Sequence, residues 1–229
     1  MPPLPRDWSA ALRMRLETLL GELARHPRLG GALLFGDRVR GASGDPQTPV
    51  GLALILESMG DPADIPLAET LRMAFLSARV EPWLVVESEL PQLADVFPLR
   101  LFELRRYGWH WHGRITTIDV EPDPVRLRAR IEQIARTTLK RRRWFALMPD
   151  KDRRPPDFTG AAHRLRVLLA AYDHLGGGTE DGLEQRCATA LGLPPERVGR
   201  ALDEAEPAAI DESLTALVRS IEARRSRGT

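Results

Sequence analysis

The densest positive charge in the sequence lies between Arg126 and Trp144, and its residues could bind phosphate. Eight basic side chains fall in this segment: Arg126, Arg128, Arg130, Arg136, Lys140, Arg141, Arg142 and Arg143. Trp144 and Phe145 adjoin the last four, so a helix here could hold phosphates while an aromatic ring stacks on a base. A solvated face of a long helix is the commoner explanation of such a run. The candidate phosphate or nucleic-acid contacts are Lys140, Arg141, Arg142 and Arg143.

Two closely spaced histidines could share a metal ion. On a strand, His110 and His112 would face one side, and Trp109 and Trp111 the other. A metal site needs a third and a fourth ligand, and the remaining histidines and the lone cysteine are scattered along the chain. We therefore predict core tryptophans and surface histidines, and no metal site.

A strand, a turn and a second strand are predicted near the start of the chain. Two short apolar segments, Gly31 to Gly36 and Val50 to Glu57, flank a stretch rich in Gly, Ser, Asp and Pro. The first segment contains Leu33-Leu-Phe-Gly-Asp, and the second follows Thr48-Pro. In this frame the chain resembles the nucleotidyltransferase superfamily, of the polymerase-beta and aminoglycoside-nucleotidyltransferase type.

The resemblance implies a nucleotide-binding site with altered chemistry. Its implied nucleotide contacts are Gly36, Asp37, Arg40 and Ser43. In the family, two aspartates at i and i+2 on the second strand hold magnesium against a nucleoside triphosphate, since alternate strand residues face one side. Here Pro49 and Gly51 occupy the matching positions, and neither offers a metal ligand. We therefore expect no cofactor, with magnesium only if an active enzyme recruits other carboxylates.

A third family carboxylate matches Glu103, within a segment from Leu99 to Gly113 that we predict as a strand with a break near Gly108. The alternative for Glu103 is a solvent-facing partner of Arg105, two residues along the same strand face. Leu127-Arg-Ala-Arg-Ile-Glu and Ala188-Thr-Ala-Leu-Gly-Leu resemble the helical tail of a bacterial group of such proteins. The likeness thus extends along the whole chain.

The pattern of apolar residues predicts a mixed first half and a helical second half. Helices are expected at 8–23, 63–78 and 91–96, and a third strand at 82–88. Everything after Pro124 has helical spacing, with a break at 149–157. The predicted fold is α/β (α+β): a small mixed sheet flanked by helices in residues 1–122, then an all-helical domain in residues 123–229.

Composition limits the setting of the protein. The formal net charge is only +1, so attraction to a polyanion must come from local clusters. A single cysteine, Cys187, fits a reducing compartment, and the N-terminal residues do not resemble a signal peptide. The longest apolar run, Val50 to Leu56, is too short to span a bilayer. We expect a cytoplasmic protein without membrane insertion.

Three functions stay open. The first is a degenerate nucleotidyltransferase that binds a nucleotide or a protein partner. The second is an active enzyme that transfers a nucleoside monophosphate to a small molecule or protein, with metal ligands recruited from Asp37, Asp45, Glu57 or Glu103. The third is a non-enzymatic interaction protein that acts through its helical half.

Overall fold

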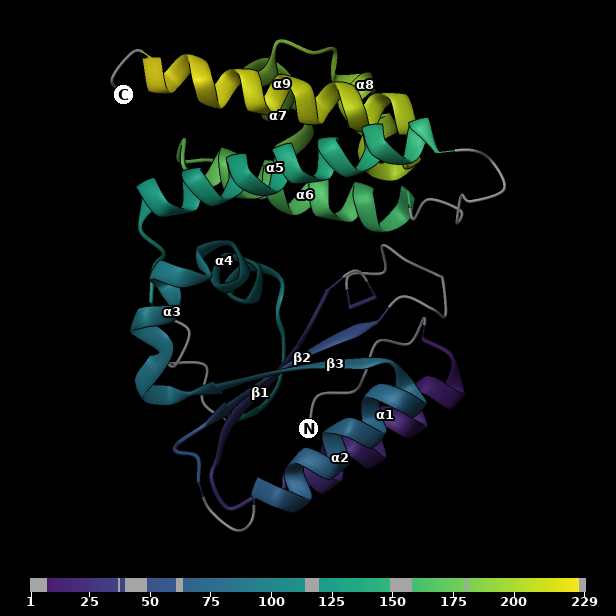
Figure 1. Cartoon of the computed structure of the whole chain (residues 1–229), viewed down its shortest axis with the longest axis vertical. Helices are drawn as coiled ribbons and strands as arrows, with labels where there is room; N and C mark the ends of the chain where they lie inside the picture. The colour runs from purple at the N-terminus through teal and green to yellow at the C-terminus, as the bar shows by residue number, and fades with distance from the viewer. Residues whose placement is uncertain are drawn as a thin grey trace. The chain divides into compact units, whose positions relative to one another are not determined.

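The computed structural model of the 229-residue chain describes residues 8–36, 38–39, 49–60, 64–113, 120–148, 158–179 and 181–226. By its internal contacts the chain divides into two compact units, Met1–Glu121 and Pro122–Thr229. Figure 1 shows both units.

The N-terminal unit is built on a mixed sheet. Its described strands are β1 (Leu29–Phe35), β2 (Val50–Leu56), β3 (Val80–Val86) and β4 (Trp109–Gly113). They lie in the order β3-β2-β1-β4. β1 pairs antiparallel with β2 and β4, whereas β2 pairs parallel with β3. A helix connects β2 to β3 along the chain.

Helices cover both faces of this sheet (Figure 1). One face packs against α1 (Ala10–Leu23) and α2 (Asp64–Ala78). The other packs against α3 (Leu90–Val96) and α4 (Pro98–Tyr107), which follow a 3-10 turn, η1 (Glu87–Glu89). All seven residues of β2 are buried, as expected for a strand covered on both sides. The mixed α/β class expected from the sequence is therefore confirmed.

The predicted strand from Leu99 to Gly113 is wrong over most of its length, because Pro98–Tyr107 forms helix α4. Pro98 lies in the first turn, where its missing N–H costs nothing. The buried residues of the helix are Pro98, Leu99, Leu101, Phe102 and Leu104, a helical spacing. The helix ends at Gly108, whose backbone is extended, with φ of −63° and ψ of 128°. A Cβ atom at this position would lie 2.3 Å from the Leu104 carbonyl oxygen, so the turn into β4 favours glycine.

The outer edge of β3 is protected against further strand pairing. The Arg79 carbonyl accepts a hydrogen bond from Val50 N–H, so alternate residues from Arg79 face β2 and those between face outward. Pro82 holds one outward position and has no N–H to donate. The N–H of Val86, another outward residue, donates to the Glu89 carboxylate at 3.4 Å. These features disfavour the addition of a strand at this edge.

Every regular element described in the C-terminal unit is a helix. The helices are α5 (Pro124–Leu147), α6 (Phe158–His174), α7 (Leu183–Leu191), α8 (Pro195–Asp203) and α9 (Pro207–Ser226). The Asp123 carboxylate caps α5 by accepting from the N–H groups of Val125 and Arg126, at 2.7 and 3.0 Å. Helix α9 packs against the other four, and its buried side chains include Leu214 and Leu217.

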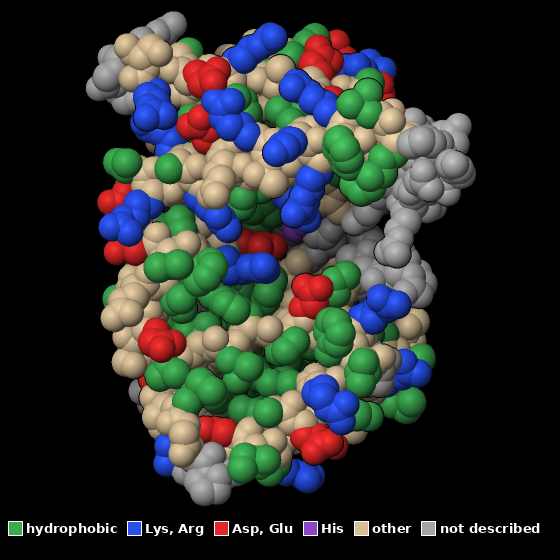
Figure 2. Space-filling view, viewed as in Figure 1, with side chains coloured by type: hydrophobic (Ala, Val, Ile, Leu, Met, Phe, Trp, Pro, Cys, Tyr) green, Lys and Arg blue, Asp and Glu red, His purple; other side chains and the backbone are tan. Residues whose placement is uncertain are grey.

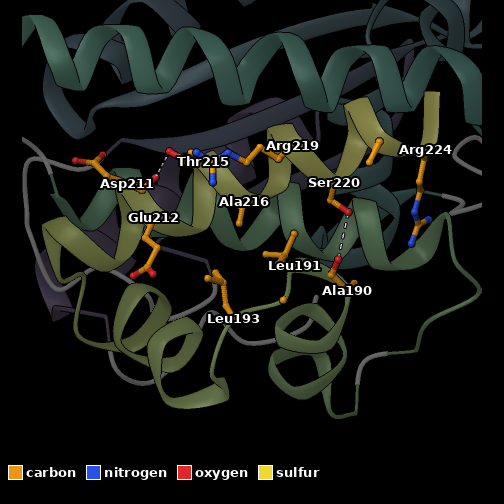
Figure 3. Close-up of a pocket in the computed structure, with 12 residues that line it drawn as sticks. Ala190, Leu191, Leu193, Asp211, Glu212, Thr215, Ala216, Arg219, Ser220 and Arg224 are labelled. Atoms are coloured by element: carbon orange, nitrogen blue, oxygen red, sulfur yellow. Dashed lines mark hydrogen bonds between the residues drawn. The ribbon is translucent and has the colours of Figure 1, made fainter. Parts of the chain in front are cut away.

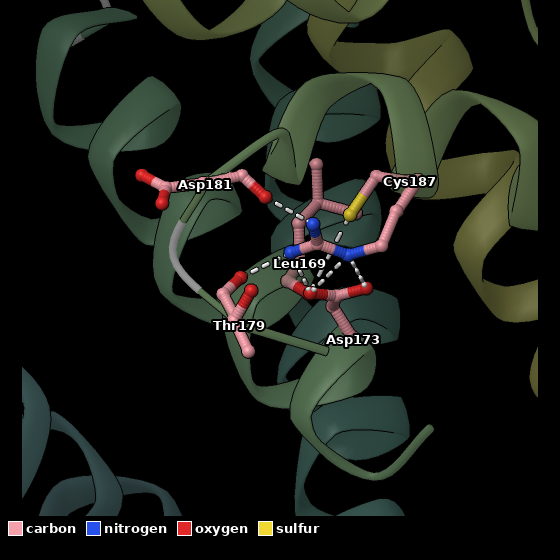
Figure 4. Close-up of polar contacts among 6 residues, drawn as sticks. Leu169, Asp173, Thr179, Asp181 and Cys187 are labelled. Atoms are coloured by element: carbon pink, nitrogen blue, oxygen red, sulfur yellow. Dashed lines mark hydrogen bonds and ion pairs between the residues drawn. The ribbon is translucent and has the colours of Figure 1, made fainter. Parts of the chain in front are cut away.

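An arginine clamps the turn between α6 and α7 (Figure 4). The Arg186 guanidinium donates to both carboxylate oxygens of Asp173, with an Nη2–Oδ2 distance of 2.7 Å, and to the carbonyls of Thr179 and Asp181. The hydrogen bond to Asp173 raises the pKa of Arg186. Beside it, Cys187 is 1% exposed and its thiol donates to the Leu169 carbonyl at 3.7 Å. Burial, with a smaller contribution from Asp173, raises the pKa of Cys187 to about 12.

We predict that stability falls between pH 9 and pH 12 partly through Cys187. The folded state binds the thiol proton more tightly than the unfolded chain, whose thiol has the ordinary pKa of 9.0. The contribution of the Cys187 thiol to the free energy of unfolding is therefore full below pH 9 and is lost as the pH rises toward 12. At about 1.4 kcal/mol per pKa unit, the loss is up to about 4 kcal/mol. Urea unfolding across this range should show a flatter decline for Cys187→Ala than for the wild type. Parallel curves would contradict the prediction.

Candidate functional site

The end of β1 and the start of β2 lie side by side where the resemblance to nucleotidyltransferases expects a nucleotide. Phe35 pairs with Gly51 across the antiparallel strands, and Pro49 directly precedes β2. Gly36 follows β1 with φ of 94°, a left-handed conformation that favours glycine. The remaining expected residues fall outside the described residues: Asp37, Arg40, Ser43 and Asp45.

An aromatic ring fills the space beside Gly51. A Cβ atom added there would lie 2.4, 2.5 and 2.7 Å from three atoms of the Phe35 ring. Phe35 is 5% exposed, and the Arg100 guanidinium carbon of α4 lies 4.7 Å from its ring centroid, a cation–π distance. A carboxylate at position 51 therefore requires the ring to move.

Glu103 lies on helix α4 and not on a strand, so the prediction that it shares a strand face with Arg105 is wrong. Its carboxylate forms an ion pair with Arg100, at a distance of 3.7 Å, and its side chain is 12% exposed. Arg105 instead pairs with Glu121 at 3.0 Å. Through Arg100, Glu103 is linked to the Phe35 ring, where it balances the charge of the arginine.

A different acidic residue lies beside position 51 in the sheet. Glu81 of β3 is the register partner of Gly51 on the parallel pair, so both face the same side. Glu81 is exposed. It was missed because the third strand was predicted to start at Pro82, and the structure extends it to Val80. Glu57 follows the other end of β2, about 20 Å from Gly51 at about 3.3 Å per residue.

The two histidines of β4 do not share a face. A β-bulge shifts the register from Leu33–His110 to Ala32–His112, and these two β1 residues belong to the cores on opposite faces of the sheet. Trp111 is buried, as predicted, and its ring centroid lies 5.3 Å from that of His112. No group of three or more potential metal ligands occurs among the described residues.

The basic segment forms the second half of α5, and its four candidate residues differ in surroundings. Arg142 is 12% exposed in its side chain and donates to the Asp211 carboxylate and, at 2.9 Å, to the Pro207 carbonyl. Lys140, Arg141 and Arg143 are exposed. Arg142 therefore holds α5 to α9, while the other three face solvent.

A groove of about 800 Å³ lies between the end of α7 and the side of α9 (Figure 3). Leu191 and Leu193 supply apolar contacts, and Arg219 supplies an exposed charge. At one end Glu212 accepts from Arg197 at 2.6 Å, and Asp211 is paired with Arg142. The volume of the groove is within the range of small-ligand sites, roughly 300 to 1,000 Å³. Asp211 and Glu212 are already paired with arginines, so a ligand would compete with these ion pairs for them.

Hydrophobic side chains gather on one face of the N-terminal unit (Figure 2). Exposed large apolar residues on and beside β3 are Leu84, Val96 and Phe97, and those of α2 are Ile65, Met73, Phe75 and Leu76. Trp83 packs edge-on against Phe97, with ring centroids 6.2 Å apart. Exposed large apolar side chains in this number are typical of interaction sites.

Comparison with known proteins supplies no family for this arrangement. No protein-family model matches the chain, and a search of curated proteins finds no significant match. Among the described helices none is long and apolar enough to cross a membrane.

We predict that Gly51→Ala destabilises the protein by roughly 1 to 3 kcal/mol, the usual cost of overpacking a core. The usual gain of about 0.5 to 1 kcal/mol from replacing a strand glycine should be overridden, because the Phe35 ring occupies the space. Gly31→Ala is the matched control, since its nearest contacts are at an ordinary 3.7 Å.

Because the Phe35 ring fills the space beside Gly51, the stability effects of substituting these two residues should depend on each other. In a double-mutant cycle by urea unfolding, Gly51→Ala should cost much less in a Phe35→Leu background. Equal costs of the Gly51 and Gly31 substitutions would show that the ring yields freely.

Proposed function

We propose that this chain is a nucleotidyltransferase-like protein that acts by binding and not by metal-dependent nucleotide transfer. The contact of the Phe35 ring with Gly51 carries the proposal. It places a buried apolar group where the resemblance expects a carboxylate, and Pro49, the other matching position, has no metal-binding atom in its side chain.

One cationic side chain, Arg100, lies near this position and is paired with Glu103. Arg100 reaches the Phe35 ring, and its side chain is 44% exposed. A guanidinium repels a magnesium ion but binds a phosphate or carboxylate through paired N–H donors. A nucleotide held without metal, or an acidic group of a protein partner, is consistent with these surroundings.

An active transferase is the weaker alternative on this geometry. Glu103 is engaged by Arg100, and Glu57 lies at the far end of β2. Glu81 is the acidic residue that the sheet brings next to Gly51, and one exposed carboxylate does not replace a pair that holds bridging ions.

A protein partner is the second candidate function, and the exposed apolar residues of β3, α2 and their neighbours favour it. The protected edge of β3 argues that such a partner would contact side chains and not extend the sheet. A cytoplasmic setting remains part of the proposal, on the basis of the lone cysteine.

We predict no transfer of nucleotide from labelled nucleoside triphosphates in the presence of magnesium or manganese. Without carboxylates to hold the ions, the transition state lacks several kcal/mol of electrostatic stabilisation. The measurement is incorporation of label into the protein itself or into small hydroxyl and amine acceptors. Incorporation that Glu81→Gln or Glu103→Gln abolishes would establish the enzyme alternative.

Restoring the carboxylates should also require removal of the ring. We predict that Pro49→Asp with Gly51→Asp does not bind manganese, whereas the same pair combined with Phe35→Ala does, because the smaller side chain leaves room for the ion. The control replaces both positions by Asn in the Phe35→Ala background. Calorimetry that detects no manganese binding to a folded triple variant would contradict the match of Pro49 and Gly51 to the family aspartates.

A further inference from the structure

The last two turns of α5 present positive charge and an aromatic ring on one side. Lys140, Arg143, Trp144 and Leu147 follow one another at helical spacing and are exposed. Arg141 flanks them and is also exposed. Trp144 is 62% exposed, an unusual position for so large an apolar side chain. We call Lys140, Arg141, Arg143 and Trp144 the α5 ridge.

The ridge has a fixed base. The inward side of the same turns contains Thr138 and Leu139, which are buried, and Arg142, which binds Asp211 and the Pro207 carbonyl of α9. Because these contacts hold the helix, the neighbouring side chains project from a rigid support. A ligand would therefore meet a fixed helix backbone, and only the exposed side chains would have to become ordered on binding.

The charge distribution suits a polyanion despite the near-neutral chain. Residues 122–229 contain 20 Lys and Arg against 16 Asp and Glu, while residues 1–121 contain 13 against 16. Helix α5 alone has eight basic residues and one acidic residue. The net positive charge is concentrated on the helix that exposes Trp144.

We infer that the α5 ridge binds single-stranded nucleic acid, with its basic side chains on phosphates and Trp144 stacked on an unpaired base. This goes beyond the proposed function and rests on a different unit of the chain. An exposed ring favours a single strand, because the bases of a duplex are already stacked on one another. An anionic membrane fits less well, because Leu127, Ile131 and Leu139 of α5 are buried, and only the few exposed apolar side chains at the end of the helix, among them Trp144 and Leu147, could insert.

Binding of the full-length protein to fluorescent oligo(dT) and oligo(U) over a range of salt tests the electrostatic part. Three phosphate contacts predict a slope of log affinity against log salt of about −2, at about 0.7 per contact on a single strand. Arg141→Ala with Arg143→Ala should reduce the slope by about 1.4. The charge-matched control, Arg164→Ala with Arg225→Ala, removes two exposed arginines of the same unit and should leave it unchanged.

Tryptophan substitution tests the stacking part. Trp144→Ala should weaken binding by about five- to a hundredfold, and Trp144→Phe by much less, because phenylalanine still stacks. Quenching of tryptophan fluorescence on binding should be largely lost in Trp144→Phe. Circular dichroism of each variant establishes that it is folded.

Several outcomes would overturn the inference. The first is an equal reduction of the salt slope in the ridge and control variants, and the second is an unchanged oligonucleotide affinity of Trp144→Ala. The others are absence of oligonucleotide binding at low salt, and binding to phosphatidylserine vesicles without binding to oligonucleotides. None of them alters the result of the nucleotide-transfer assay, so the two proposals fail independently.

Discussion

The burial of β2 on both faces is the constraint on which the N-terminal unit depends. Helices α1 and α2 cover one side and α3 and α4 the other, and every residue from Val50 to Leu56 is buried. In such a place a charged side chain must be paired or must hold a metal ion, since an isolated buried charge is too costly. A strand covered on both faces is therefore expected to be apolar and closely packed, and the sequence of β2 fits this expectation.

Phe35 of β1 contacts both β2 and a charged residue of α4. The ring needs glycine at position 51, and it also receives the Arg100 guanidinium from α4. Arg100 in turn pairs with Glu103. One aromatic side chain thus accounts for the glycine in β2 and for a contact with α4, and the arginine that makes this contact also pairs with Glu103.

Local patterns predicted most elements, and contacts between distant residues account for what they missed. Strands β1 and β2 are short apolar runs between turn residues, and the long helices have clear periodicity. Helix α4 differs from the predicted strand because its five inward residues also fit an apolar strand segment, although Pro98 is a helix-start signal. The bulge that separates His110 from His112 depends on pairing with β1. The Phe35–Gly51 contact and the Arg142–Asp211 ion pair likewise join residues that no short window includes.

The basic run of α5 illustrates why charge must be judged by its partners. Arg142 has a structural role, because its side chain is only 12% exposed and pairs with Asp211 of α9. The exposed cations beside it do not stabilise the helix in this way: like charges at i and i+3 or i+4, as in Lys140 and Arg143, cost a few tenths of a kcal/mol per pair. Trp144 forgoes most of the stabilisation that burial of its ring would give. Folding therefore gains little from these solvent-facing cations and the exposed tryptophan, which is consistent with the nucleic-acid contact inferred for them.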